Sequence, residues 1–370
     1  MPHSINRSAQ PSAESLIDED RRRGRGARSN RVGRYESELR EDFDDGWESL
    51  GDLDVFKTEV RIEPARSIIS TNDSPDLSFD RSINPYRGCE HGCIYCYARP
   101  THCYLGHSPG LDFETKLYAK TNGAALLEEE LAKSGYVPAT IALGAVTDPY
   151  QPIEREYRIT RSILEVLERT GHPVGIVTKS ALVVRDLDIL ARMAERDLVR
   201  VAISVTTLDR RVARKMEPRA ATPPRRLEAI RQLSEAGVPV SAMVAPIVPG
   251  LTDSEIERIL EAVHDAGARD AGYVLLRLPL ELKELFREWL STEFPDRAQR
   301  VISLLQSMHG GLDYVSKFGL RQRGSGPYAE QIGLRFRLAL QRLGMNRGSF
   351  RLRTDLFQRP VPKGGQMQLL

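Results

Sequence analysis

The stretch Cys89-Glu-His-Gly-Cys93-Ile-Tyr-Cys96 holds three of the four cysteines of this chain, in the spacing C-x3-C-x2-C. A loop with these offsets can turn three thiolates toward one point without closing a regular helix. Cysteine thiolates hold iron–sulfur clusters, and a 4Fe–4S cluster normally takes four of them. The triplet therefore predicts a 4Fe–4S cluster in which one iron is left open to a small chelating ligand.

Zinc is the main alternative to a cluster. The fourth cysteine, Cys103, and two nearby histidines, His91 and His102, would complete a tetrahedral site with the triplet. Zinc ligands usually come as two C-x2-C or Cys/His pairs with a longer spacer, which does not match this spacing. Disulfides are disfavoured, because thiols this close would pair with strain and because no secretory signal leads the chain. Cys103 itself is a bystander, a fourth ligand in a resting form, or a redox thiol.

The composition is that of a soluble globular protein, with 41% hydrophobic and 28% charged residues in 370. The formal net charge of +2 is too small to indicate a nucleic-acid partner by itself. We find no run long enough to cross a bilayer and no apolar signal core at the N-terminus. Reduced thiols together with an oxygen-sensitive cluster predict a cytoplasmic location.

Three regions of the chain differ in character. Residues 1–55 are polar and charge-blocked, with the arginine-rich run 21–28 followed by an acidic stretch, and we expect them to be disordered or to wrap the surface. Residues 56–280 carry alternating strand and helix patterns, with the cysteine loop at 84–104. Residues 281–370 predict a basic helical extension.

From about residue 79, short apolar strands alternate with amphipathic helices. The first strand, Ser78–Tyr86, delivers the cysteine loop at its C-terminal end. The other predicted strands are Thr140–Val146, Val174–Thr178, Val199–Thr206, Val238–Ala245 and Ala271–Leu278. Helices are predicted between them at 122–135, 159–171, 187–193, 223–237 and 256–263. This alternation predicts a parallel sheet covered by helices, either an open doubly wound sheet or a curved partial barrel.

Polar side chains replace the apolar run where the strands end. The positions are Thr147 and Asp148 after the second strand, 178–180 after the third, 204–207 after the fourth and 246–250 after the fifth. In both parallel α/β arrangements, reactive groups lie at the carboxyl ends of the strands. The set therefore predicts a ligand-lined mouth, although each position alone also fits a turn or a helix N-cap.

These motifs together resemble the radical S-adenosylmethionine (SAM) enzymes, and within them the SplB-like branch that includes spore photoproduct lyase. The stretches that carry the resemblance are Gly24–Ala27, Ser82–Cys89, Cys96–His102, Thr147–Pro152 and Arg323–Tyr328. The cysteine motif is highly specific for the superfamily, and the flanking motifs are moderately specific for the branch. The resemblance implies an α/β partial TIM-type (β/α)6 barrel with a polar N-terminal and a helical C-terminal extension.

The resemblance also implies roles for individual residues. The cluster ligands would be Cys89, Cys93 and Cys96. The SAM contacts would be Tyr95, Thr147, Lys179 and Ser204. Tyr95 would pack near the adenine, and an ammonium at Lys179 would offset the charge of the methionine carboxylate in a poorly hydrated mouth.

One position departs from the lyases. These enzymes carry a cysteine near the end of the second strand, which returns a hydrogen atom to the substrate radical. The corresponding residue here is Ala145, and no cysteine follows Cys103. We therefore do not expect the lyase reaction by the same route, and Tyr97 or Tyr150 would be the hydrogen donors to consider.

The predicted function is an enzyme that reductively cleaves SAM to methionine and a 5′-deoxyadenosyl radical, which attacks an unknown substrate. The lyase resemblance and eight arginines between residues 321 and 353 suggest a nucleic acid. A solvated helix face explains these arginines equally well. A flavodoxin or ferredoxin would supply the electron. The alternatives are a non-catalytic zinc or nucleic-acid-binding module and an iron–sulfur redox sensor.

Overall fold

Six strands run parallel in one sheet and follow one another in chain order. They are β3 (Arg81–Ile83), β6 (Ile141–Leu143), β7 (Val174–Thr178), β8 (Val199–Ser204), β9 (Val240–Ile247) and β10 (Asp270–Leu275). A seventh strand, β2 (Ile69–Thr71), pairs antiparallel with β3. The computed structural model describes residues 22–36, 55–348 and 351–361, and within these ranges β2 and β10 form the two edges of an open sheet. The predicted α/β fold with six parallel strands is confirmed.

The two faces of this sheet differ chemically. One face carries rows of branched apolar side chains, such as Leu143, Ile176, Val201 and Val240 on four neighbouring strands, and all of them are buried. The row one residue earlier points to the other face and reads Ala142, Gly175 and Arg200. Closed TIM barrels fill their interior with bulky branched residues. Here a row of buried branched residues lies on one face, and the row Ala142, Gly175 and Arg200 on the opposite face is made of smaller and polar residues.

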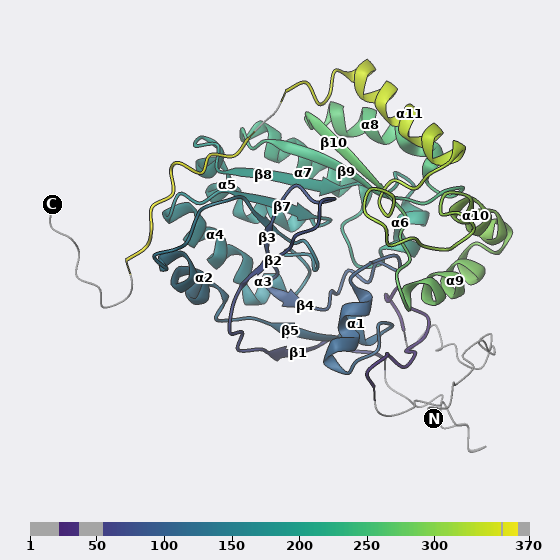
Figure 1. Ribbon diagram of the computed structural model, residues 1–370, viewed down its shortest axis with the longest axis horizontal. Coiled ribbons are helices and arrows are strands. Elements are labelled where there is room, and N and C mark those ends of the chain that lie inside the picture. The colour runs from purple at the N-terminus through teal and green to yellow at the C-terminus, as the bar shows by residue number, and fades with distance from the viewer. Residues whose placement is uncertain (1–21, 37–54, 349–350, 362–370) are drawn as a thin grey trace.

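Helices cover the apolar face of the sheet (Figure 1). The longer ones are α2 (Gly123–Ala132), α4 (Ile159–Arg169), α5 (Leu187–Ala194), α7 (Pro223–Glu235) and α8 (Ile256–Asp265). Shorter helices between the strands are α3 (Glu154–Tyr157), α6 (Arg210–Met216), η4 (Ala181–Asp186) and η5 (Asp253–Glu255). The predicted apolar stripes face the sheet, since Ile159 and Ile163 of α4 and Ile259 and Val263 of α8 are buried.

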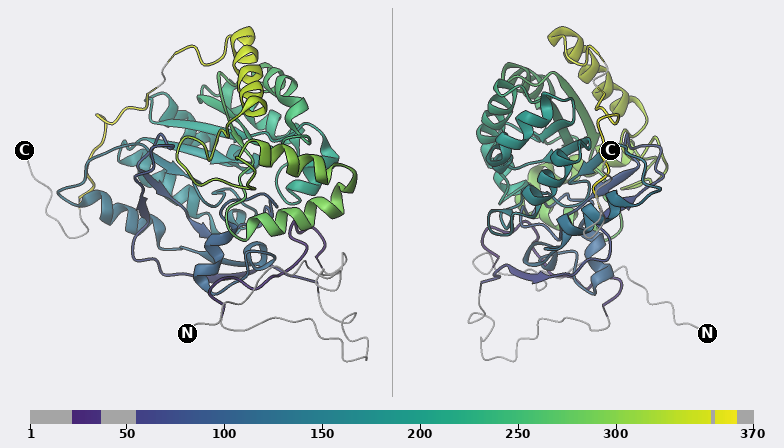
Figure 2. Two further views of the ribbon diagram at one scale, coloured as in Figure 1. Left: turned by 45° about the vertical axis from the view of Figure 1, so that its right-hand side comes forward. Right: turned by 90° about the vertical axis from the view of Figure 1, so that its left-hand side faces the viewer.

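The helical C-terminal extension consists of α9 (Leu282–Glu293), α10 (Pro295–Ser307) and α11 (Pro327–Leu343). Proline stands at the first position of α10 and α11, where its missing N–H costs no helical hydrogen bond. Helix α11 lies beside α8 in the views of Figures 1 and 2. None of the helices in the described part of the chain is long and apolar enough to cross a membrane.

A small second sheet lies under the cysteine loop. It consists of β1 (Glu59–Ile62), β5 (Lys116–Ala119) and β4 (Tyr86–Arg87), with the short helices η3 (Arg99–Leu105) and α1 (Asp112–Thr115) beside it. The prediction of one strand over Ser78–Tyr86 is therefore wrong. Pro85 has no N–H for a ladder, so the chain leaves the main sheet after Ile83 and joins β5 in the small sheet at Tyr86.

Residues 22–36 lie on the body of the protein, where Arg22, Arg25, Ala27 and Ser29 are buried. Most of the remaining predicted N-terminal extension, residues 1–21 and 37–54, lies outside the described residues. The domain boundaries at residues 55 and 280 stay predictions.

Candidate active site

The cysteine loop consists of three consecutive backbone turns. The carbonyl of each cysteine accepts a hydrogen bond from the N–H three residues later, at Gly92 (3.3 Å), Cys96 (3.2 Å) and Arg99 (3.1 Å). Gly88 and Gly92 adopt φ of 72° and 65°, which glycine tolerates without strain. The C-x3-C-x2-C spacing thus places one cysteine at the start of each turn.

The three cysteines of the loop lie close enough to influence one another. Burial raises the pKa of Cys89, and Asp148, Cys93 and Cys96 raise it further. Burial, followed by the carboxylate of Glu217, raises the pKa of Cys93 to about 12. All three are free thiols, and Cys96 is the most accessible of them.

Cys103 lies elsewhere, on η3, and is fully buried. Burial raises the pKa of its thiol, and the charged groups that influence it are Arg34, Glu36 and Glu281 rather than the other cysteines. The structure therefore separates Cys103 from the triplet that precedes it. A tetrahedral zinc site on all four cysteines would need them to meet at one ion.

The buried ion pair of Arg99 and Glu114 holds the cysteine loop by hydrogen bonds to its carbonyl groups. Arg99 donates to the carbonyls of Cys93 (2.9 Å) and Gly92 (3.1 Å), and its Nη2 lies 2.5 Å from Oε1 of Glu114. Neither Arg99 nor Glu114 has exposed surface. Glu114 also accepts the N–H groups of Gly26 and Ala27, at 2.8 Å each. The pair therefore ties the cysteine loop to the N-terminal segment.

A second ionic contact joins the loop to the strand ends. His91 Nδ1 lies 3.3 Å from Asp148, which follows β6. Asp148 also accepts the hydroxyl of Thr178 and the N–H of Lys179, both at 2.7 Å, at the end of β7. Burial opposes its ionisation, but His91 and these hydrogen bonds outweigh burial and lower the pKa of Asp148 to about 2.

Three of the four predicted SAM contacts lie together. Thr178 is in register with Ile203, so Lys179 and Ser204 occupy neighbouring positions at the ends of β7 and β8. The Lys179 ammonium lies 5.8 Å from the centre of the Tyr95 ring. Burial opposes the charged form of Lys179, but Cys93 and Glu217 raise its pKa, so the ammonium stays charged.

Thr147, the fourth predicted contact, faces the loop that enters the cysteine motif. Its hydroxyl donates to the carbonyl of Tyr86 (2.9 Å), and its N–H donates to the side chain of Asn84 (3.2 Å). Thr147 is buried and sits next to Asp148. Its observed contacts therefore hold the chain before the cysteines in place.

A buried network behind Tyr95 was not predicted from the sequence. The Tyr95 hydroxyl donates to Glu217, which pairs with Arg226, and Thr206 donates to the same carboxylate at 2.7 Å. Arg226 also donates to the carbonyl of Ser204 at 2.9 Å. Burial opposes the charge on Glu217, but Arg226 and Lys179 lower its pKa. No local motif marks this pair, because its members belong to the turn after α6 and to α7.

The two tyrosines considered as hydrogen donors differ in position. Tyr97 is 45% exposed, its hydroxyl donates to the carbonyl of Ala145, and the Arg277 guanidinium lies 4.5 Å over its ring. Tyr150 has no exposed surface, and burial, together with Asp186 and Glu154, raises the pKa of its hydroxyl. Tyr97 is therefore the tyrosine next to the position where the lyases carry cysteine.

The donor set fits an iron–sulfur cluster. Within the described ranges, no three Cys, His, Asp or Glu side chains converge as ligands of a single metal ion. A 4Fe–4S cluster does not require this convergence, since its thiolates bind separate irons. Free thiols on one loop, with the Lys179 ammonium beside Cys93, suit an anionic thiolate cluster.

The family model of the radical SAM superfamily matches residues 83–263, which span the cysteine loop and the strands from β3 to β9. The part of the chain from β3 to α8 is therefore similar to the radical SAM superfamily. The matched residues include every predicted cluster ligand and every predicted SAM contact of this chain.

Several relatives of this chain carry no assigned function, and one, at 26% identity over 50% of this chain and 36% of that protein, is a radical SAM Nalpha-GlyT isomerase of Pseudomonas phage M6. The uncharacterized protein Rv2578c of Mycobacterium tuberculosis is 39% identical over 226 residues, 60% of this chain and 66% of that protein. The uncharacterized protein MJ0683 of Methanocaldococcus jannaschii is 27% identical over 245 residues, 65% of this chain and 85% of that protein. Spore photoproduct lyase complexed with dinucleoside spore photoproduct has a similar fold, with a TM-score of 0.51 at 19% identity over 77% of this chain and 79% of the lyase chain. At 19% identity this likeness is one of fold.

Proposed function

We propose that this chain is a radical SAM enzyme that holds a 4Fe–4S cluster on Cys89, Cys93 and Cys96. The proposal is supported above all by three free thiols on one loop, with the charged Lys179 beside Cys93. When bound, the cluster supplies the electron that cleaves SAM to methionine and a 5′-deoxyadenosyl radical. A flavodoxin or ferredoxin is the proposed electron donor, and the cytoplasm is the proposed compartment.

The side chains around the loop would bind and orient SAM. Lys179 would pair with the carboxylate of SAM, because its ammonium is charged and close to the cysteine triplet. Tyr95 would provide an apolar surface for the adenine, held in orientation by Glu217. Ser204 would reach the ribose from the end of β8, and Thr147 would contribute from the turn after β6. The buried Arg99–Glu114 pair would keep the loop rigid.

A nucleic acid is the proposed substrate class. Spore photoproduct lyase, which shares the fold, has been solved in complex with a dinucleoside photoproduct. Ala145 replaces the lyase cysteine, so a different residue must return the hydrogen atom if the reaction needs one. Tyr97 is our candidate, because its hydroxyl lies at the carbonyl of Ala145 and its side chain is accessible.

Anaerobic reconstitution tests the proposed cofactor chemistry. The wild-type protein should take up about four irons per chain and, once reduced, convert SAM to 5′-deoxyadenosine. The C89A/C93A/C96A variant should lose both properties, while the matched control C103A should keep them, because Cys103 lies away from the triplet. If the triple variant retains iron and SAM cleavage, the proposal is wrong. Stoichiometric zinc, or a cluster that ignores SAM, would also contradict it.

The Lys179→Ala variant tests the proposed SAM site. Loss of a charge-assisted pair with the SAM carboxylate should raise the apparent KM for SAM by about tenfold or more. The iron content should stay at the wild-type level, because Lys179 is not a cluster ligand. An unchanged KM would place the SAM carboxylate elsewhere.

A further inference from the structure

A strongly basic pocket of about 720 Å³ lies between the N-terminal segment, α6 and α9. We refer to it as the basic pocket. The arginine-rich run at residues 22–26 forms one wall, and Arg211, Arg214 and Lys215 of α6 form another. Pro218 and, from α9, Trp289 and Glu293 complete the lining. The volume is in the range of sites that hold small-molecule ligands or a short stretch of polymer.

Cations outnumber carboxylates in the lining of the basic pocket. Its lining includes three arginines of the N-terminal run and three cations of α6, but a single carboxylate, Glu293. That carboxylate already pairs with Arg28 and Lys215. In the part of the chain that the structure describes, the exposed side chains of Arg23, Arg211 and Arg214 form no ion pair. Burial, together with repulsion from Arg219, lowers the pKa of Arg25, as expected where like charges gather.

The arginine-rich wall is built into the fold. Gly24 turns the chain with φ of 74°, and Arg25 donates to the carbonyls of Glu114 (3.0 Å) and Phe56 (3.1 Å) and to the hydroxyl of Thr58 (2.9 Å). Gly26 lies so close to the cysteine loop that a Cβ would stand 1.9 Å from the carbonyl oxygen of Gly92. Only glycine fits at this position, so the N-terminal segment packs directly against the cysteine loop here.

The basic pocket adjoins the cysteine loop through the turn after α6. Pro218 lines the pocket, and its side chain lies 3.3 Å from where a Cβ of Gly92 would be. The next residue, Arg219, donates its N–H to the carbonyl of His91, and Ile94 donates to the carbonyl of Met216. A ligand in the pocket would therefore sit beside the proposed cluster.

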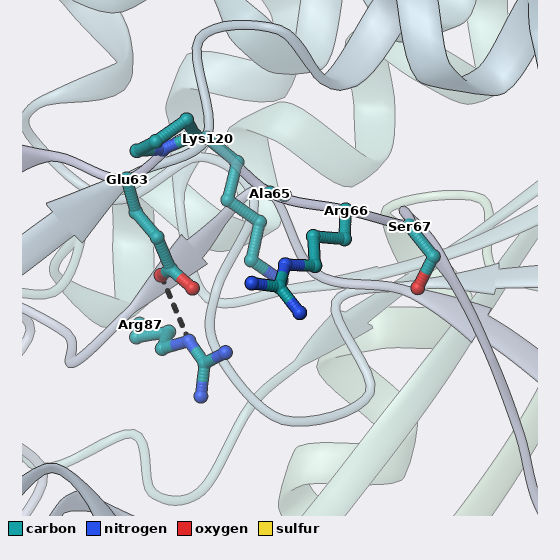
Figure 3. A pocket seen from close by; sticks show the side chains of 7 residues that line it. Glu63, Ala65, Arg66, Ser67, Arg87 and Lys120 are labelled. Carbon is teal, nitrogen blue, oxygen red and sulfur yellow. Dashed lines mark hydrogen bonds and ion pairs between the residues drawn. The ribbon is translucent and has the colours of Figure 1, made fainter.

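A second basic pocket, of about 310 Å³, differs in charge balance (Figure 3). It is lined by Glu63, Arg66, Arg87 and Lys120, and Arg87 pairs with Glu63 at 2.8 Å. The lining of this second pocket thus contains one carboxylate and three cations, and the cation Arg87 is already paired with that carboxylate. The larger pocket has the greater excess of unpaired arginines.

The chemistry of the basic pocket favours phosphate groups. Guanidinium groups bind phosphate oxygens in a planar, two-pronged geometry, and a row of them neutralises a phosphodiester backbone. The one large aromatic in the lining, Trp289, is almost fully buried, so it offers no platform for stacking bases. Recognition through phosphates alone predicts binding that is insensitive to base sequence and steeply dependent on salt.

We propose that the basic pocket binds the phosphodiester groups of a nucleic-acid strand and holds that strand beside the cysteine loop. The binding is argued from the pocket alone, while the role of the strand as substrate rests on the proposed function. Because the pocket lies next to the loop, the bound strand would present its nucleotides to the site where the radical forms.

Fluorescence anisotropy with a labelled DNA single strand and its duplex tests this proposal. The R211E/R214E variant should raise Kd at least tenfold and reduce the slope of log K against log salt by about two. The matched control is R297E/R300E, which reverses two arginines of α10 at the same spacing and outside the pocket. It should leave Kd at the wild-type value. Circular dichroism and thermal unfolding verify that each variant is folded.

The outcomes separate this proposal from the proposed function. Equal Kd for wild type and R211E/R214E, or no DNA binding by wild type, overturns the pocket proposal. So does displacement of the DNA by polyglutamate as readily as by unlabelled DNA, because the partner would then be an acidic protein. SAM cleavage by wild type without DNA is measured separately. If the wild-type protein does not cleave SAM, the proposed function is wrong, whereas the result on DNA binding is unaffected.

Discussion

The two arginine-rich ends of the described chain use their charge differently. In the C-terminal part, Arg321, Arg335, Arg342 and Arg353 each pair with a carboxylate, on Asp76, Glu257, Glu261 and Asp355. In the N-terminal part, Arg23 stands with Arg211 and Arg214 of α6, and no carboxylate of the described residues pairs with these three side chains. The comparison shows that pairing, and not the number of arginines, decides where positive charge remains for a ligand.

The two ends are also attached by different forces. Arg28, Arg31 and Arg34 pair with Glu293, Glu288 and Glu281 along α9. Near the C-terminus, Phe357 packs on aromatic rings instead, with its centre 5.6 Å from Tyr136 and 5.5 Å from His172. Ionic attachment weakens with salt, whereas ring packing does not. The predictions below test this contrast, from the largest expected effect to the smallest.

The Glu114→Ala variant should have the largest effect, at the N-terminal attachment. It leaves the guanidinium of Arg99 buried and unpaired and removes the acceptor of two backbone N–H groups, which should lower the free energy of unfolding by about 3–5 kcal/mol. Urea unfolding followed by circular dichroism measures the loss. A midpoint equal to that of wild type would show that the N-terminal segment and the loop are held by other contacts.

Acid should weaken the C-terminal attachment through His172. Burial lowers the pKa of His172 to about 4, below its value in the unfolded chain, so the folded state binds fewer protons. The free energy of unfolding is therefore unaffected by His172 above about pH 6.5. It falls by about 1.4 kcal/mol per pH unit as the pH drops from there toward 4. Urea unfolding at several pH values should show a smaller acid loss in H172Q.

His102, near the cysteine loop to which the N-terminal segment is attached, should titrate in the same way as His172. Burial lowers its pKa to about 4 as well, and it lies on η3 after the cysteine loop. H172Q should therefore keep the part of the acid loss that belongs to His102. An acid loss of the same size in H172Q and wild type would contradict the assignment to His172.

The Phe357→Ala variant should have a smaller effect. Phe357 is half-buried, so removing its ring should lower the free energy of unfolding by about 2 kcal/mol, less than for a fully buried phenylalanine. The loss should be the same at low and high salt, since no charge is removed. A loss that shrinks as salt is added would argue against attachment by ring packing.

The smallest effect is expected for Arg342→Gln. The pair of Arg342 with Glu261 is exposed on both sides, and such pairs contribute about 0.5 kcal/mol or less. DNA binding should be unchanged, because this arginine lies outside the basic pocket. A weaker DNA affinity in this variant would extend the binding surface to α11.

Much of the fold could be predicted from local sequence patterns. Strand β7 was predicted with its observed bounds, Val174–Thr178, and α4, α5 and α8 were placed by their apolar stripes. These signals repeat every two or every three to four residues, so a short window contains them. The cysteine triplet is equally local, and its role as cluster ligand stays a prediction.

Only the tertiary structure decided which distant charges meet. Glu114 reaches Gly26 across 88 residues, and Glu217, Arg226 and Tyr95 meet from separate elements. Likewise, Arg23 joins Arg211 and Arg214 of α6 in one pocket, whereas Arg321 and Arg335 find carboxylates. Ion pairing depends on distances of a few ångströms between residues far apart in the chain, and such distances are set by how the helices and strands pack.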